Sequence, residues 1–368
     1  MRAANSRVTA TVLVALAVTA TLTIVYVVPY DTILTSPPSH GDSAATSASS
    51  STTSTTVTTH TGNNASASFL FSPLLAPGAK LAMTYPSEYD QLASFVLGRI
   101  NRDRAASNLS PVQLSSIPSG QQHADSMLHF GYLSHWDTQG LKPYVRYSLL
   151  NGTGAMEENV AYESTDLPTF TNLGFIESSL ARLENQMMNN DSLCCDNGHR
   201  DNILDPIHNF VSLGIEYNGT RVYLVEDFEN SYTSLAQPMA TGGTVSFVGN
   251  SSINLRNLQV VVYYDQLPAN LTAAQMRSPP YSGSYSSGEF IGGVVPSCFL
   301  SCEKYQSGTT VRADTWDTTN STVRIDFKLA DFVSSYGKGV YTVYLETGPD
   351  DDVTGTPETL VGVSILSG

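Results

Sequence analysis

The pattern of apolar and polar positions divides the chain into four stretches of different character. Residues 8–28 are apolar and carry no charge, and residues 32–66 are dominated by Ser, Thr, Ala and Gly. Beyond them, apolar residues recur at both helical and alternating spacing, and after residue 235 they only alternate with polar ones. The pattern therefore predicts four units, at residues 1–30, 31–83, 84–234 and 235–368.

The first unit is an N-terminal membrane anchor or signal. A helix over residues 8–28, at about 1.5 Å per residue, matches a bilayer core of roughly 30 Å. Arg2 and Arg7 precede the run, so the positive-inside rule keeps the N-terminus in the cytoplasm and exports the rest. A signal peptide cleaved after the small residues at 18–20 is the alternative. We favour an uncleaved transmembrane helix because the apolar run continues through Val28. Either interpretation places the following chain outside the membrane.

The second unit is expected to be a disordered stalk. Its Ser/Thr tract cannot bury a core and is typical of an O-glycosylated tether. Sequons of the type N-x-S/T follow along the exported chain and favour a surface glycoprotein, although chance explains several of them in a chain rich in Ser, Thr and Asn. The candidate glycosylation sites are Asn64, Asn108, Asn151, Asn190, Asn218, Asn250, Asn270 and Asn320.

The third and fourth units predict an α+β fold. Helical spacing of apolar residues predicts helices over residues 87–105, 119–131 and 172–190. Strands at 210–217 and 220–228 flank an Asn-Gly turn, which is a hairpin signal. After residue 235, short alternating strands between turn signals predict an all-β, Ig-like sandwich without a convincing helix.

Composition narrows the function classes. The chain has 33 acidic and 18 basic residues and a net charge of −15, which argues against nucleic-acid binding. Only 14% of residues are charged, below the usual share of about 25%. No G-x-S-x-G elbow, Walker motif or dinucleotide-binding glycine motif is present in the sequence.

Four cysteines exclude a disulfide-dense scaffold. Outside the membrane they are expected to oxidise, and four cysteines allow three connectivities. A Cys298–Cys302 loop is the easiest and a Cys194–Cys195 ring is strained, whereas the other two connectivities join the third unit to the fourth. Ligation of a metal by Cys194 or Cys195 beside His199 is the alternative to a disulfide.

Five of the seven histidines fall between residues 123 and 208. A histidine and a carboxylate in one cleft can bind a divalent cation or transfer protons. These residues lack the i, i+4 spacing of a helical metal motif, so spacing alone favours ordinary structural histidines.

An ordered series of motifs resembles the CAP superfamily, which includes cysteine-rich secretory proteins, antigen 5 and plant pathogenesis-related proteins. The nearest likeness is to its prokaryotic, SCP-like branch. The resemblance covers roughly residues 84–232 and implies an α-β-α sandwich with a central antiparallel sheet and a surface cleft. The motifs are Asn101 with Arg104, GQQHADSM from residue 120, GYLSH from residue 131, Arg146, EENVA from residue 157 and GHRDNIL from residue 198.

The resemblance implies a divalent-metal cleft built from His135, Glu158 and His199, with zinc as the expected ion. The family's further acidic position, in a W-x-x-E arrangement, maps to Asn190, with Asp191 beside it and no Trp. Three ligands with an open water position are chemically adequate for zinc.

Other polar residues near these motifs have ordinary structural interpretations. His123 is expected to pack within its helix, and His129 and His208 to lie on the surface or in loops. Arg146 is expected to pair with an acidic residue, either in the cleft or elsewhere. Asn159 is expected to fix a turn.

Three functions remain open from the sequence. The first is a cell-surface, non-enzymatic binding or adhesion module whose His/Glu cleft holds a divalent cation and which recognises a glycan, lipid or protein. The second is a secreted metal-dependent hydrolase, with metal-bound water on His135 and His199 and Glu158 as ligand or base. The third is a structural envelope component. The membrane is a partner through the N-terminal helix, and the fold alone does not decide between these functions.

Overall fold

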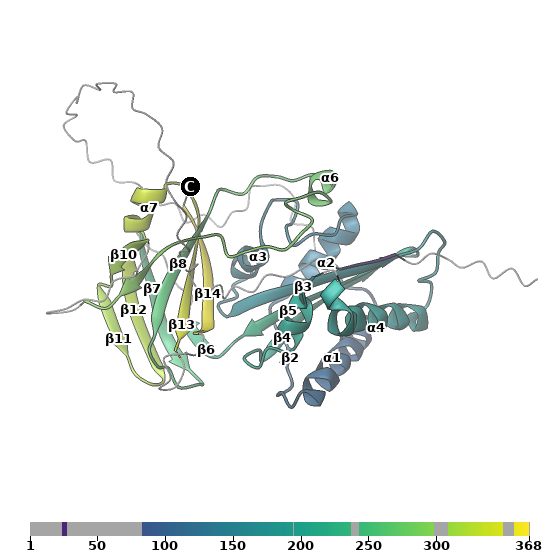
Figure 1. Cartoon of the computed structure of the whole chain (residues 1–368), viewed down its shortest axis with the longest axis horizontal. Coiled ribbons are helices and arrows are strands. Elements are labelled where there is room, and N and C mark those ends of the chain that lie inside the picture. The colour runs from purple at the N-terminus through teal and green to yellow at the C-terminus, as the bar shows by residue number, and fades with distance from the viewer. Residues whose placement is uncertain are drawn as a thin grey trace, which may run out of the picture.

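The computed structural model describes residues 24–27, 83–193, 195–236, 243–297, 308–348 and 357–367 (Figure 1). The expected stalk and most of the expected membrane segment lie outside these residues. Within the apolar run, Ile24–Val27 form strand β1, which pairs antiparallel with residues 161–164. No helix in the described ranges is both long enough and apolar enough to cross a membrane.

The first folded unit contains a five-stranded sheet in the order β1-β3-β5-β4-β2. Its strands pair antiparallel except for β2 and β4, which run parallel. The three predicted helices and the hairpin are confirmed. The elements are α1 (Tyr89–Ala106), β2 (Gln113–Leu114), α2 (Ser119–Phe130), α3 (Pro143–Leu149), β3 (Ala155–Ser164), α4 (Leu173–Asn189), the 3₁₀ turn η1 (Asp191–Leu193), α5 (Gly198–Ile203), β4 (Phe210–Tyr217) and β5 (Arg221–Asn230).

Helices cover both faces of this sheet. On one face α1 and α4 pack with β4 and β5 in a core that includes Leu92, Leu180 and Leu213. On the other face α2 packs with β3 and β5 through residues such as Met127 and Val225. Figure 1 shows α1 and α4 on one side of the sheet and α2 and α3 on the other. The result is a three-layer α-β-α arrangement.

Local signals set the ends of these helices. The side chain of Asn172 accepts a hydrogen bond from the N–H of Phe175 and caps α4. Gly131 ends α2 in a left-handed conformation with φ of 70°, which favours glycine because a Cβ there is strained.

The second folded unit is a sandwich of two sheets, in the orders β10-β9-β8-β13-β14 and β11-β12-β7-β6. The sheets share one core that includes Phe247, Phe327 and Tyr341. The elements are β6 (Thr233–Ala236), β7 (Thr244–Ser251), β8 (Gln259–Asp265), α6 (Ala273–Met276), β9 (Glu289–Val295), β10 (Thr309–Arg312), β11 (Thr315–Thr318), β12 (Thr322–Lys328), α7 (Ala330–Tyr336), β13 (Gly339–Thr347) and β14 (Glu358–Ser367).

The all-β expectation for this unit needs a correction. It contains two short helices, α6 and α7. A capping box formed by Thr272 and Gln275 starts α6, which is a sequence signal that apolar periodicity does not detect. The alternation predicted the two-sheet architecture but not these interruptions, and an Ig-like relationship stays a prediction.

The two units contact each other through β14. The N–H of Ser364 donates to the Ser148 hydroxyl at 3.0 Å, and Asn230 Nδ2 donates to the carbonyl of Thr359 at 2.8 Å. Because β6 already pairs with β7 from Thr233 onward, the sandwich begins close to the expected boundary at residue 235. The domain limits stay predictions.

The sequon asparagines lie at positions that glycans can reach. Within the described ranges seven of them are exposed, and Asn64 lies outside those ranges. Exposure is required for N-glycosylation but does not demonstrate it, so the modification stays a prediction. The exposed residues are Asn108, Asn151, Asn190, Asn218, Asn250, Asn270 and Asn320.

Candidate functional site

The first part of the candidate site is a buried cluster around Glu158 on β3. His135, which follows α2, places Nδ1 at 2.9 Å from Glu158 Oε1. Arg146 on α3 donates from Nη2 to Glu158 Oε2 at 2.5 Å. Both carboxylate oxygens are therefore occupied by protein groups, and two of the three residues that the resemblance assigns to one cleft are in contact. Arg146 pairs with Glu158, which is the acidic residue of that expected cleft.

Burial perturbs the titrating groups of this cluster. It raises the pKa of Glu158 to about 7, although Arg146 opposes the shift. Asp227 lies opposite Glu158 in the register of β3 and β5, and burial together with the Glu158 charge raises its pKa well above the usual range. Glu158 and Asp227 thus form a coupled carboxyl pair in a low-dielectric environment.

His123 belongs to the same cluster. The sequence predicted only that it packs within its helix. Burial and the nearby Arg146 charge hold its pKa well below the usual value. Its Nε2 lies 2.7 Å from the carbonyl oxygen of Ser134. A carbonyl only accepts, so His123 is the neutral tautomer with its proton on Nε2. The same nitrogen is 3.9 Å from Glu158 Oε1.

Tyr285 completes the cluster from the chain between β8 and β9. Its ring centroid lies 4.7 Å from that of His135. Its hydroxyl oxygen accepts the backbone N–H of Glu158 at 3.0 Å. The contact of Tyr285 could not be predicted from the sequence, because Tyr285 is separated from Glu158 by 127 positions and belongs to no local motif.

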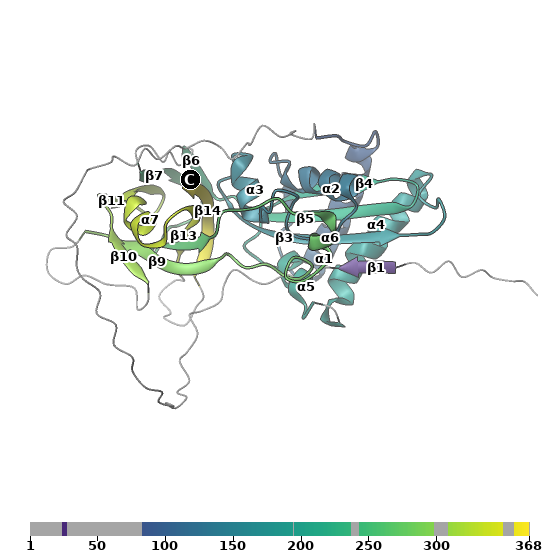
Figure 2. The same cartoon turned by 90° about the horizontal axis from the view of Figure 1, so that it is seen from above.

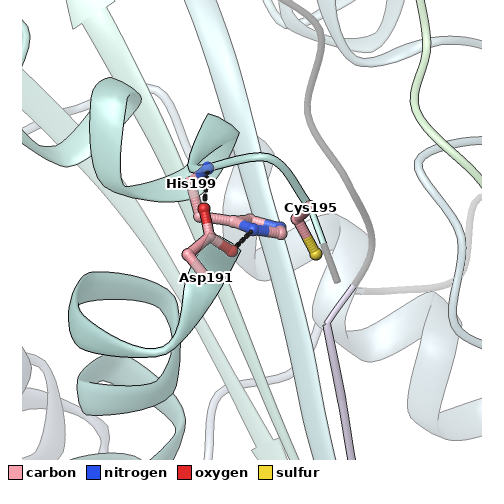
Figure 3. Close-up of side chains that lie close together, drawn as sticks. All are labelled: Asp191, Cys195 and His199. Carbon is pink, nitrogen blue, oxygen red and sulfur yellow. Dashed lines mark hydrogen bonds and ion pairs between the residues drawn. The ribbon is translucent and has the colours of Figure 1, made fainter. Parts of the chain in front are cut away.

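The second part of the site pairs His199 with Asp191 (Figure 3). His199 lies in the first turn of α5, and its Nδ1 is 2.6 Å from Asp191 Oδ1. The other carboxylate oxygen accepts the backbone N–H groups of His199 at 2.8 Å and of Arg200 at 3.2 Å. Asp191 therefore caps α5 and orients the His199 ring. The acidic position assigned to Asn190 is filled by Asp191, one residue later.

Cys195 lies beside this pair (Figure 3). Asp191, Cys195 and His199 each offer an atom within 4.8 Å of the others, so the group has the spacing to hold a metal ion. However, Cys195 is disulfide-bonded, and metal ligation requires a thiolate. Its bonding partner is not among the described residues, and the connectivity stays a prediction.

The two histidine–carboxylate pairs use different partners, and neighbouring residues of β3 face opposite sides of the sheet. Glu158 faces His135, whereas the next residue, Asn159, donates to the His199 carbonyl and to Glu226 Oε2, each at 3.2 Å. Asn159 thus links α5 to the sheet instead of fixing a turn. In the described part of the chain, neither metal-like group includes His135 or Glu158. The structure brings His135 and Glu158 together but gives His199 a different partner.

The other metal-like group consists of Glu157, Asp205 and His208. His208 lies in the loop between α5 and β4, as one of the two expected alternatives has it, but it is 2% exposed and therefore not a surface residue. Its Nδ1 and Nε2 lie 2.6 and 2.9 Å from the side-chain oxygens of Asn230 and Asn202. Burial lowers the pKa of His208, but Glu157, Asp205 and Asn230 together raise it above the usual value. A protonated ring with two amide acceptors is not a metal ligand.

Comparisons with known proteins add little support to the CAP resemblance. No family model matches this chain, and no curated protein matches it. A solved structure of an extracellular protein containing an SCP domain from Bacillus anthracis str. Ames is similar at 17% identity and a TM-score of 0.29. The similarity covers 40% of this chain and spans 45% of that one. Similarity this weak establishes neither a shared fold nor a shared function, so the CAP resemblance rests on the motifs.

Proposed function

We propose that this chain is a CAP-type binding or adhesion module that acts at the cell surface without turning over its ligand. The burial of the site carries the proposal. His135, Glu158 and His199 are each 0% exposed, and Arg146 and His135 occupy the Glu158 oxygens. A hydrolase needs a general base and a water position that substrate can reach. All three side chains are buried, so none of them presents a general base to a substrate at the surface.

The ligand set also favours a function without a catalytic metal. Zinc sites use four protein ligands when structural and about three when catalytic. With Cys195 in a disulfide, His199 and Asp191 supply two ligands, and His135 contacts Glu158 instead. The described residues therefore do not fit a complete zinc site, and we propose a function that needs no bound ion.

The setting of the proposed module follows from the rest of the chain. An N-terminal anchor and a Ser/Thr stalk would hold the folded head outside the membrane. A net charge of −15 disfavours nucleic acid as a partner. A glycan, a lipid or another surface protein is the proposed ligand class, and glycosylation of the exposed sequons would fit this location.

Turnover by the purified full chain tests the proposal. The chain is incubated with panels of ester, peptide and glycoside substrates, with and without zinc, beside a Glu158→Gln variant. We expect equal background rates for both proteins, together with saturable binding to an immobilised glycan or to lipid vesicles. Turnover by the wild type that disappears in Glu158→Gln would replace the module with a hydrolase.

A hydrolase has one specific observation in its favour. The pKa of Glu158 is about 7, beside a second buried carboxyl in Asp227. Paired carboxyls with separated pKa values can divide acid and base roles near neutral pH. Glu158 and Asp227 are both buried, so this pair would act as acid and base only in a state in which substrate reaches it.

A further inference from the structure

A long connection of the sandwich crosses to the first unit. We call residues 266–288, between β8 and β9, the strap. In Figure 1 and Figure 2 the strap carries α6 away from the sandwich and over the sheet of the first unit. Its one regular element is the four-residue helix α6. The strap is therefore part of the second unit along the chain, but it lies against the first unit.

Apolar side chains attach the middle of the strap. Met276 is 0% exposed and Leu271 is 8% exposed. Both belong to the cluster that includes Met127 of α2 and Val160 of β3.

Near the end of the strap, Tyr285 belongs to a further buried cluster with Tyr144 and Met156. Neither the main core of the sandwich nor the core beneath α1 and α4 contains a strap residue. The strap can leave without dismantling either of these two cores.

Polar contacts place the strap directly over the Glu158 cluster. Tyr285 contacts His135 and accepts the Glu158 N–H, as described above. The hydroxyl of Ser134, next to His135, donates to the carbonyl of Tyr281 at 2.6 Å. The part of the strap that follows α6 thus covers the two residues that CAP-type motifs place in a cleft.

Both ends of the strap are held at the start of α3. Lys142 Nζ lies 2.7 Å from Asp265 Oδ1 and donates to the Ser286 carbonyl at 2.8 Å. The hydroxyl of Tyr144 donates to Asp265 Oδ2 at 2.5 Å. One lysine and one tyrosine therefore clamp the two ends together.

Buried polar atoms beneath the strap lack partners. His123 Nδ1 and Arg146 Nε have no hydrogen-bond partner among the described protein atoms. Leaving such atoms unsatisfied in one cluster is costly. A state in which these groups meet water or a polar ligand would relieve that cost.

We propose that the strap is a lid through which the C-terminal sandwich controls access to the His135–Glu158 cluster, and that a polar group of the ligand enters when the lid leaves. This inference rests on the proposed function, since it places ligand binding by the module at this cluster. It makes the sandwich a regulator of the site in addition to a spacer. Segments with little regular structure and a small separate apolar contact area open at lower free-energy cost than a domain core.

Modification of histidines in the full chain by diethyl pyrocarbonate, followed by peptide mass spectrometry, tests the lid. The wild type should label exposed His129 quickly and leave His135 and buried His208 protected. A Leu271→Ala/Met276→Ala double variant removes the apolar attachment of the middle of the strap and leaves that of Tyr285 in place. We expect its His135 to label about tenfold faster or more, because each truncation removes buried contacts, while His208 stays protected.

Two further variants keep the test decisive. Asp265→Asn releases the clamp without touching an apolar core, and it should raise His135 labelling by a smaller factor. Phe332→Ala truncates the sandwich core away from the strap and should leave His135 protected. Joint labelling of His135 and His208 in the double variant would show that the strap is part of the folding core and overturn the lid. Unchanged His135 protection in both strap variants would also overturn it.

Labelling reports accessibility and requires no ligand. The lid can therefore fail while the binding function stands, and the binding function can fail while the lid stands. The substrate and vesicle assays decide the second question by themselves.

Discussion

The two histidine–carboxylate pairs of this protein are built in different ways. His199 and Asp191 lie eight positions apart and are held by the start of a short helix. His135 and Glu158 come from different elements of the first unit. Arg146 neutralises the Glu158 carboxylate, and Tyr285 from the chain between β8 and β9 covers the pair. The first pair depends on local backbone geometry, whereas the second depends on the assembly of both folded units. The difference predicts that the pairs respond separately to substitution.

The largest expected effect on stability comes from removing Arg146, the cation beside the His135–Glu158 pair. Arg146→Ala leaves Glu158 buried and uncompensated, and breaking such a pair costs about 3–5 kcal/mol. Urea unfolding at pH 8, where Glu158 is ionised, measures this loss. Adding Glu158→Gln to the variant should recover part of it. Arg182→Ala, at a side chain that is 51% exposed and paired with Glu163, is the matched control and should cost about 1 kcal/mol or less.

Stability should fall as pH rises from about 4.5 to about 8. Burial raises the pKa of Glu158 to about 7, and burial with the nearby Glu184 charge raises that of Glu226 to about 8. In this window the folded chain binds more protons than the unfolded chain, so deprotonation favours unfolding. Each such group contributes a slope of up to about 1.4 kcal/mol per pH unit.

Two variants measure how much the carboxyl groups beside each histidine–carboxylate pair contribute to this pH dependence of stability. Glu226→Gln removes a carboxyl on the His199 side of the sheet, and Glu158→Gln removes one on the His135 side. Urea midpoints at pH 5, 6, 7 and 8 should give a flatter profile for each variant than for the wild type. A wild-type midpoint that rises between pH 5 and pH 8 would contradict the raised pKa values.

A smaller loss is expected at the local pair. Asp191→Ala removes the helix cap and the partner of His199, and cap removal costs roughly 0.5–2 kcal/mol. Asp191→Asn retains a capping oxygen and should recover most of the loss in thermal unfolding. The nuclear magnetic resonance signals of the His135 ring should stay in place in both variants. A shift of His135 as large as that of His199 would mean that the two pairs form a single site.

The smallest expected effect concerns the covering tyrosine. Tyr285→Phe keeps the ring on His135 and removes the acceptor for the Glu158 N–H. Loss of one such hydrogen bond costs about 0.5–1.5 kcal/mol, with a buried N–H left unsatisfied. Amide hydrogen exchange at Glu158 should accelerate while exchange in α5 stays unchanged. Exchange that is unaltered at Glu158 would contradict the contact.

The sequence predicts the local features of this molecule well. The helices at α1, α2 and α4 and the β4–β5 hairpin follow from periodicity and turn residues, which act over a few positions. The motif resemblance placed His135 and Glu158 in one cleft, and the structure brings them into contact. It mapped the acidic position to Asn190 with Asp191 beside it, and Asp191 is the carboxylate that contacts His199 because it also accepts the N–H groups at the start of α5.

Long-range features could not be predicted in this way. No pattern near Tyr285 indicates that it covers His135, since the strap is a connection of the other unit. The opposite orientations of Glu158 and Asn159 follow from strand alternation only once the boundaries of β3 and its neighbours are known. The resemblance placed His135, Glu158 and His199 in one ligand set. The described structure pairs His135 with Glu158 and His199 with Asp191, and a shared metal site stays a prediction.

The central proposal is that His135 and His199 belong to separate histidine–carboxylate pairs and share no ion. Zinc content of the purified full chain after loading and dialysis, measured beside His135→Ala and His199→Ala, tests this claim directly. We expect no stoichiometric zinc that both single variants lose. One equivalent of zinc retained by the wild type and lost equally from both variants would contradict the account and restore a shared metal site.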